Sequence, residues 1–166
     1  MSNTHTTIGV DSPHTTMLMH TTRCNIIGCN ADLLLIVMRA ISDVSWIMPR
    51  WCATIIIRYA NAEPSDDAYL RVFPDPVTSS ARIEIFDSFF APDLSRIDRA
   101  ALVAHELIHI HISMIMRWSR RIVERRIDGP SKDDALDELE ERHEMVVVGL
   151  EQAFRVALER IIETEQ

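Results

Sequence analysis

The sequence has few cysteines, no hydrophobic run long enough to span a membrane and no excess of basic residues. Its three cysteines, Cys24, Cys29 and Cys52, are an odd number without C-x-x-C spacing. This argues against a disulfide scaffold or a cysteine-rich zinc site, and it predicts reduced thiols in a cytoplasm. The net charge of −8 argues against a general nucleic-acid binder, which would carry a basic surface. No basic start followed by a continuous apolar stretch precedes residue 30, so a secretory signal is not expected.

The most apolar stretch, residues 100–116, is shorter than the roughly 20 residues that cross a bilayer. It also contains Glu106 and three histidines, which are costly in lipid. A buried helix without membrane contact is therefore predicted. The hydrophobic fraction of 47% and the length of 166 residues suit one globular domain, and no internal repeat is visible.

The order of the remaining patterns predicts an α+β domain over residues 31–166. Residues 1–30, rich in Thr, His and Asn, are predicted to be a mobile extension. Asn30 or Asp32 can cap a first helix that ends before Pro49. Three β-rich runs follow and predict a small sheet of about three strands, antiparallel or mixed; the runs are 53–59, 68–73 and 81–86.

Two long helices complete the predicted domain and pack on the sheet. The first begins at the capping box Ser95-x-x-Asp98 and extends to about Trp118. The second follows the break at Asp128-Gly129-Pro130, is capped by Ser131-x-x-Asp134 and ends near Ile162.

The first of these helices contains an H-E-x-x-H motif, His105-Glu106-Leu107-Ile108-His109. On a helix the two histidines lie about 40° apart and one turn along, so both imidazoles can bind one zinc ion. Glu106 lies about 60° beyond His109, where its carboxylate can act as general base towards a metal-bound water. Its neighbours are apolar, so these three polar groups need partners. The alternative is two core histidines bonded to carbonyls or carboxylates, which leaves Glu106 unexplained.

A catalytic zinc needs a third protein ligand and an open position. The metzincin pattern is excluded, because Ile112 and Ile115 stand where it requires Gly and His. His111 lies about 240° around the helix from His105 and points away. On the last helix, Glu141 points outwards, His143 lies on the apolar stripe, and Glu140 and Glu144 lie about 60° and 100° from its centre. The angles slightly favour Glu140 and leave Glu144 open.

An H-E-x-x-H helix followed by a helix that donates a glutamate resembles the gluzincin class of zinc metallopeptidases. The segments HELIHIHIS and ERHEMVVVGLEQAF also resemble small metallopeptidase-like proteins of bacteriophages and prophages, over roughly residues 31–160. The resemblance implies a zincin-like, minigluzincin-like fold and assigns Glu144 as the third zinc ligand. It places Val148 where gluzincins often carry an Asp that bonds a zinc histidine, so that partner must come from elsewhere. If Glu140 were the ligand, Glu144 would occupy that position.

The resemblance implies zinc-dependent hydrolysis of a peptide or protein substrate, in the cytoplasm of a bacterium or a phage-infected host. A transition-state stabiliser is not assigned by motif; the candidates are His143, Tyr59 and Tyr69. By analogy an exposed edge strand, residues 82–86, would hold the substrate. The alternative function is a metal-binding regulatory or interaction module that cleaves nothing. The arginines between 117 and 126 are either a solvated helix end or a local site for an acidic peptide, a terminal carboxylate or a nucleic-acid backbone.

Overall fold

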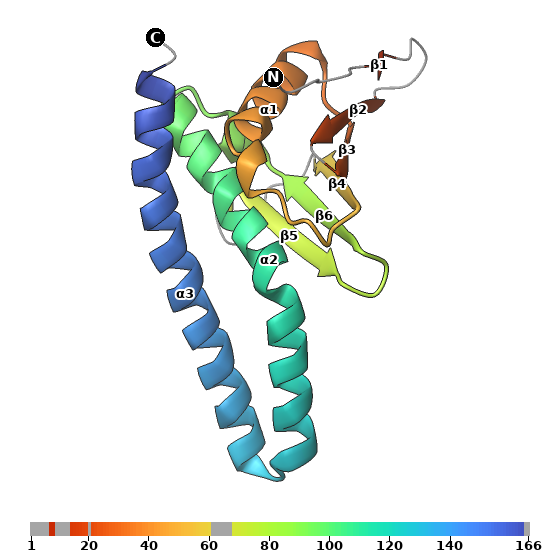
Figure 1. Ribbon diagram of the computed structural model, residues 1–166, viewed down its shortest axis with the longest axis vertical. Helices are drawn as coiled ribbons and strands as arrows, with labels where there is room; N and C mark the ends of the chain where they lie inside the picture. The colour runs from red at the N-terminus through yellow and green to blue at the C-terminus, as the bar shows by residue number, and fades with distance from the viewer. Residues whose placement is uncertain (1–6, 9–13, 20, 61–67, 165–166) are drawn as a thin grey trace.

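The computed structural model describes residues 7–8, 14–19, 21–60 and 68–164 and has an α+β architecture (Figure 1). In these residues one mixed sheet has the strand order β1-β2-β3-β4-β6-β5. The strands are β1 (Thr7–Ile8), β2 (His14–Met19), β3 (Thr22–Ile27), β4 (Thr54–Tyr59), β5 (Leu70–Asp75) and β6 (Ser80–Ile85). The helices are α1 (Ala31–Asp43), α2 (Arg96–Arg126) and α3 (Pro130–Glu163), with short 3-10 turns η1 (Ser45–Ile47) and η2 (Asp87–Phe90).

The amino-terminal part of the chain differs from its prediction as a mobile extension. Residues 14–19 and 22–27 form an antiparallel pair of strands, and β3 lies parallel beside β4. Cys24 and Ile26 of β3 are buried, so this segment belongs to the hydrophobic core. Residues 1–6 and 9–13 lie outside the described part of the chain. The sheet is consequently larger than the predicted three strands.

The sheet is also less antiparallel than predicted. β4 pairs in parallel with both β3 and β6, whereas β5 and β6 form an antiparallel hairpin. The turn of this hairpin spans residues 76–79, after Asp75 at the end of β5. The Asp75 carboxylate accepts a hydrogen bond from the Val77 N–H at 3.0 Å. The predicted edge strand, residues 82–86, is wrong: β6 lies between β4 and β5, and β5 is at the edge.

The predicted helix starts are confirmed at two places. Asn30 accepts a hydrogen bond from the Leu33 N–H at the start of α1, and Ser95 with Asp98 forms a reciprocal capping box at the start of α2. α2 continues to Arg126, two turns beyond the predicted end. The predicted cap of the last helix by Ser131 is wrong: α3 starts at Pro130 and no side chain caps it. Gly129 precedes it with a φ of 74°, which allows the sharp reversal of the chain.

The core lies between the sheet and the helices. Its fully buried side chains come from α1, β3, β4, β6, α2 and α3; they include Val37, Ile26, Ile55, Ile83, Leu107 and Leu158. α2 packs against the edge strand β5 on one side and against α3 on another. The α2–α3 hairpin extends past the sheet, with α3 as the outermost element (Figure 1).

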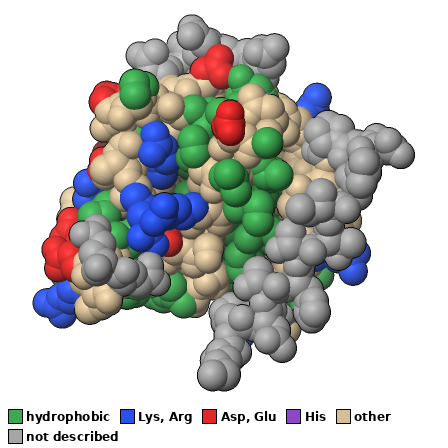
Figure 2. Space-filling model, turned by 90° about the horizontal axis from the view of Figure 1, so that it is seen from above, with side chains coloured by type: hydrophobic (Ala, Val, Ile, Leu, Met, Phe, Trp, Pro, Cys, Tyr) green, Lys and Arg blue, Asp and Glu red, His purple; other side chains and the backbone are tan. Residues whose placement is uncertain are grey.

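Figure 2 shows the end of the molecule that lies opposite the loop between α2 and α3. Hydrophobic side chains form a band on this face, beside a group of Lys and Arg side chains. No helix in the described part of the chain is long and apolar enough to cross a membrane.

Candidate metal centre

The H-E-x-x-H motif occupies the part of α2 that lies between β5 and α3. Leu107, Ile108 and Ile110 are buried and fix this turn against the core. His105 and His109 are then directed towards α3, with side chains 24% and 15% exposed. The polar motif residues therefore lie at a partly covered seam, as the apolar surroundings predicted.

The two imidazoles converge on one point. Their Nε2 atoms are 3.1 Å apart, and the ring centroids are 4.8 Å apart. In a tetrahedral zinc site with bonds of about 2.0–2.1 Å, ligand nitrogens are separated by about 3.3 Å. The observed separation therefore fits a shared metal ion.

The opposite nitrogen of each ring has a partner on α3. The His105 Nδ1–H donates to Glu151 Oε2 at 2.9 Å, because a carboxylate can only accept. His109 Nδ1 lies 3.2 Å from His143 Nε2. When His109 donates from Nδ1 to His143, both Nε2 lone pairs face each other, as two ligands of one metal ion would. When His143 donates instead, the His109 Nε2–H donates to His105 Nε2.

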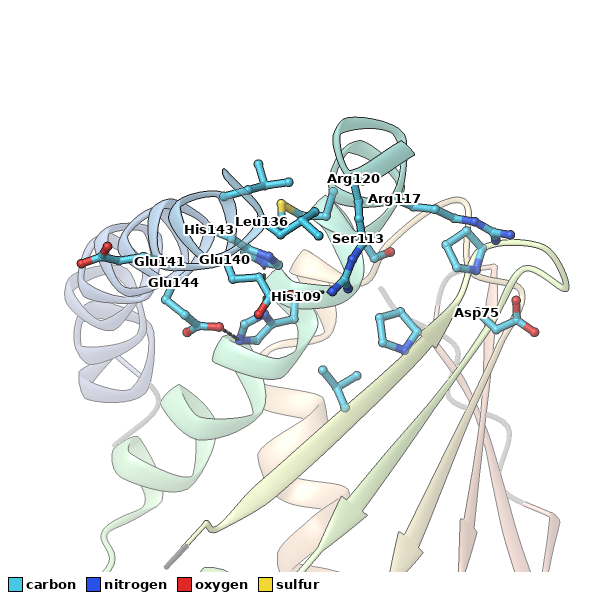
Figure 3. Close-up of a pocket in the computed structure, with 15 residues that line it drawn as sticks. Asp75, His109, Ser113, Arg117, Arg120, Leu136, Glu140, Glu141, His143 and Glu144 are labelled. Carbon is cyan, nitrogen blue, oxygen red and sulfur yellow. Dashed lines mark hydrogen bonds and ion pairs between the residues drawn. The ribbon is translucent and has the colours of Figure 1, made fainter. Parts of the chain in front are cut away.

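Glu144 completes a three-ligand group. One donor atom from each of His105, His109 and Glu144 lies within 4.8 Å of the others, and Glu144 Oε1 is 3.6 Å from His109 Nε2. Figure 3 shows the Glu144 carboxylate directed at the His109 ring. Two imidazoles and a carboxylate match the ligand set of catalytic zinc sites.

Glu140, which the helix angles slightly favoured, has a different partner. Its carboxylate accepts from the Arg120 guanidinium at 2.9 Å, across the seam between α2 and α3. Arg120 also lies 4.0 Å from Glu124 on its own helix. The geometry thus brings Glu144 to the histidines and engages Glu140 elsewhere.

Burial changes the proton affinities of the motif residues. It raises the pKa of the Glu106 carboxyl from 4.5 to about 7; the nearby His105 and the Val72 backbone N–H oppose this rise, and Glu144 adds to it. Burial also lowers the pKa of His109 to about 4, with His105 and His143 acting in the same direction. A neutral His109 near a carboxyl group that titrates near pH 7 is suited to metal binding and proton transfer.

A cleft of about 690 Å³ opens beside the cluster (Figure 3). Its lining is apolar along β5 and along the facing sides of α2 and α3, with His109, His143 and Glu144 at the cluster and Arg117 and Arg120 beyond it. Two of the predicted arginines are thus cleft residues. Hydrogen bonds from Thr78 and Val77 lower the pKa of Asp75, and the charge of Arg117 makes a smaller contribution in the same direction.

Other candidates from the sequence lie apart from the cluster. His111 donates from Nε2 to the Ile47 carbonyl at 2.6 Å, and Glu141 points away from the cluster in Figure 3. The Tyr59 hydroxyl donates to Asp87. In the described residues, neither Tyr59 nor Tyr69 lines the cleft. His143 contacts the Nδ1 side of His109, away from Nε2, which favours a positioning role over the predicted stabiliser role.

Sequence reasoning missed Glu151. It lies two turns beyond Glu144 on the same face of α3, and this spacing was the available signal. Comparison with protein-family models, curated proteins and solved structures gives no match to this chain. The gluzincin resemblance therefore depends on the motif residues alone and stays a prediction.

Proposed function

We propose that the protein is a zinc-dependent peptidase in which His105, His109 and Glu144 hold the metal. The observation that carries the proposal is the pair of Nε2 atoms 3.1 Å apart, with both Nδ1 atoms engaged from α3. In the tautomer in which both rings are protonated on Nδ1, two imidazole lone pairs are directed at one point beside a carboxylate. When bound, zinc would polarise a peptide carbonyl and activate a water molecule.

Glu106 is the general base in this proposal. With a pKa of about 7, its carboxyl group can take up a proton at neutral pH and pass it to the leaving amine. The hydrogen bond from the Val72 backbone N–H orients the carboxylate, since Val72 lies on the edge strand that flanks α2. A base needs this combination of fixed position and matched pKa.

The substrate would be a peptide in extended form along β5. This strand lies at the edge of the sheet and contributes Val72 and Pro74 to the cleft wall. An exposed edge offers backbone groups for pairing with a peptide. Pro74 has no N–H, so the pairing would be confined to the part of β5 before it.

The decisive experiment compares wild type with Glu106→Gln, loaded with zinc and incubated with a peptide library. We expect one zinc per chain in both proteins and cleavage by the wild type alone. Full activity of the variant would contradict the role of Glu106. Cleavage without bound metal would contradict the metal site.

The second candidate function is a metal-binding module without peptidase activity. Two contacts favour it: His143 contacts His109, and Arg120 pairs with Glu140. His143 and Arg120 are the cleft side chains that could otherwise contact a reacting carbonyl, and both already have partners. One equivalent of zinc with no turnover of any library peptide would support this candidate.

A further inference from the structure

The outward face of α3, opposite the candidate metal ligands, carries exposed apolar side chains beside Gln152 over its middle section. Val147 is fully buried against α2, and Met145, Gly149 and Val156 lie about 160–180° around the helix from it. Met145 is 69% exposed and Val156 is 52% exposed. Exposed apolar side chains gathered on one helix face indicate a surface that another element can cover.

A hollow on the same face has the shape that accepts a side chain from another helix. It is lined by Glu138, Glu141, Arg142, Met145 and Val146. The first four of these stand at positions i, i+3, i+4 and i+7, which form the four-residue hole of knobs-into-holes packing. In the described residues, α3 packs mainly against α2, which lies on its other side.

We propose that a second copy of this chain covers this face, with the two α3 helices antiparallel about a two-fold axis at Gly149. Such an axis pairs positions that are equally far before and after residue 149. Val156 of the second copy then lies over Arg142 and enters the hollow. Because the axis is two-fold, the same contact forms twice.

The charges at the two ends of the face are complementary under this axis. Glu138 lies as far before Gly149 as Arg160 lies after it, so each glutamate meets the other copy's arginine. Residues 137–144 carry five acidic side chains and one arginine. Of the two arginines in residues 155–160, Arg155 pairs with Asp98 at the start of α2, so Arg160 is the cation that this face contributes. A parallel arrangement would instead place the acidic ends together, which is unfavourable.

Gly149 favours the same crossing point. A Cβ atom at this position would meet nothing within 4 Å, so packing within the chain does not require glycine there. Glycine in an exposed helix interior costs about 1 kcal/mol relative to alanine. Its benefit in a dimer is that two helix backbones can approach closely where no side chain intervenes.

The first test is the oligomeric state of the full chain by sedimentation equilibrium over a range of concentrations. We expect a monomer–dimer equilibrium for the wild type and a monomer for Val156→Arg, which would place an added guanidinium against Arg142 of the other copy. Ile115→Arg on α2, at a side chain 64% exposed, is the matched control and should remain dimeric. A monomeric wild type, a dimeric Val156→Arg or a monomeric Ile115→Arg would overturn the proposal.

The second test is a charge exchange that depends on the antiparallel register. Glu138→Arg and Arg160→Glu should each weaken dimerisation by about fivefold or more, because each creates two like-charge contacts. The double variant should restore wild-type dimerisation. Additive weakening in the double variant would overturn this register, and thermal unfolding of each protein would verify that it is folded.

The third test is a cross-link at the axis. Gly149→Cys should form an intermolecular disulfide on mild oxidation, since the native cysteines are all buried and the two introduced thiols would face each other. Ile115→Cys should remain uncross-linked. Efficient cross-linking of Ile115→Cys, or none of Gly149→Cys, would contradict the proposed axis.

Discussion

Glu151 accepts a hydrogen bond from His105 Nδ1 at 2.9 Å and so connects the first candidate metal ligand on α2 to α3. With Glu144 as the proposed ligand, Val148 occupies the position four residues on where gluzincins often carry an Asp that bonds a zinc histidine. In this chain the contact comes from seven residues after Glu144, two helical turns on. The carboxylate fixes the imidazole tautomer with Nε2 unprotonated.

Glu151→Ala should lower zinc affinity by about 10- to 100-fold, because His105 loses the acceptor that orients its ring. Competition with a chromophoric chelator would measure the change. Glu141→Ala, at an exposed position directed away from the cluster, is the control and should leave the affinity unchanged. An unaltered affinity in Glu151→Ala would argue against a positioning role.

Glu144→Gln and Glu140→Gln separate the two predicted third ligands. Loss of the Glu144 carboxylate should lower zinc affinity by more than about 100-fold, since it removes a direct ligand. Glu140→Gln removes only the partner of Arg120 and should have little effect on affinity. The reverse ranking would identify Glu140 as the ligand.

Zinc should stabilise the wild type and the His111 variant, but not the His109 variant. A ligand at about 1,000 times its Kd adds about 4 kcal/mol to the free energy of unfolding. His109→Ala loses a ligand, whereas His111→Ala loses the contact to the Ile47 carbonyl and should lower the melting temperature with and without zinc. Thermal unfolding with and without excess zinc measures these shifts. A full zinc response in His109→Ala would contradict the site.

Glu106→Gln should stabilise the metal-free protein in a pH-dependent manner. The pKa of Glu106 rises from 4.5 to about 7 on folding, so its stability contribution is complete below pH 4.5 and lost as the pH rises through 7. Above pH 7 the fold holds a buried carboxylate at a cost of about 3 kcal/mol, which Gln avoids. The gain in free energy of unfolding should reach this size at pH 8 and disappear near pH 4.

Urea unfolding in the presence of a chelator, repeated between pH 4 and pH 8, would measure that gain. His109 titrates in the same interval, but it is common to both proteins and cancels in their difference. A gain that is independent of pH would show that Glu106 is not buried as a carboxylate.

Local signals in the sequence were sufficient for much of the fold. Side-chain caps at Asn30 and Ser95 marked two helix starts. β-Branched residues marked β4, and alternating side chains marked β5 and β6. The strands β2 and β3 were not predicted, because exposed polar side chains alternate with their buried residues and hide the pattern. The buried residues include Met17, Met19, Cys24 and Ile26. Strand order is set by long-range pairing, so the edge position of β5 had no local signal.

The sequence by itself determined that His105, Glu106 and His109 lie on one helical turn, because helix periodicity alone sets their relative angles. Only the tertiary structure decided which α3 side chains face them. Exchanging Glu144 for Glu140 would require α3 to rotate by about 40° and to slide by about 6 Å along its axis. Packing of Val147 and Leu158 against the rest of the fold sets both the rotation and the position of α3. The same packing brings Glu151 and His143 to the two Nδ1 atoms and leaves Gly149 on the outer face.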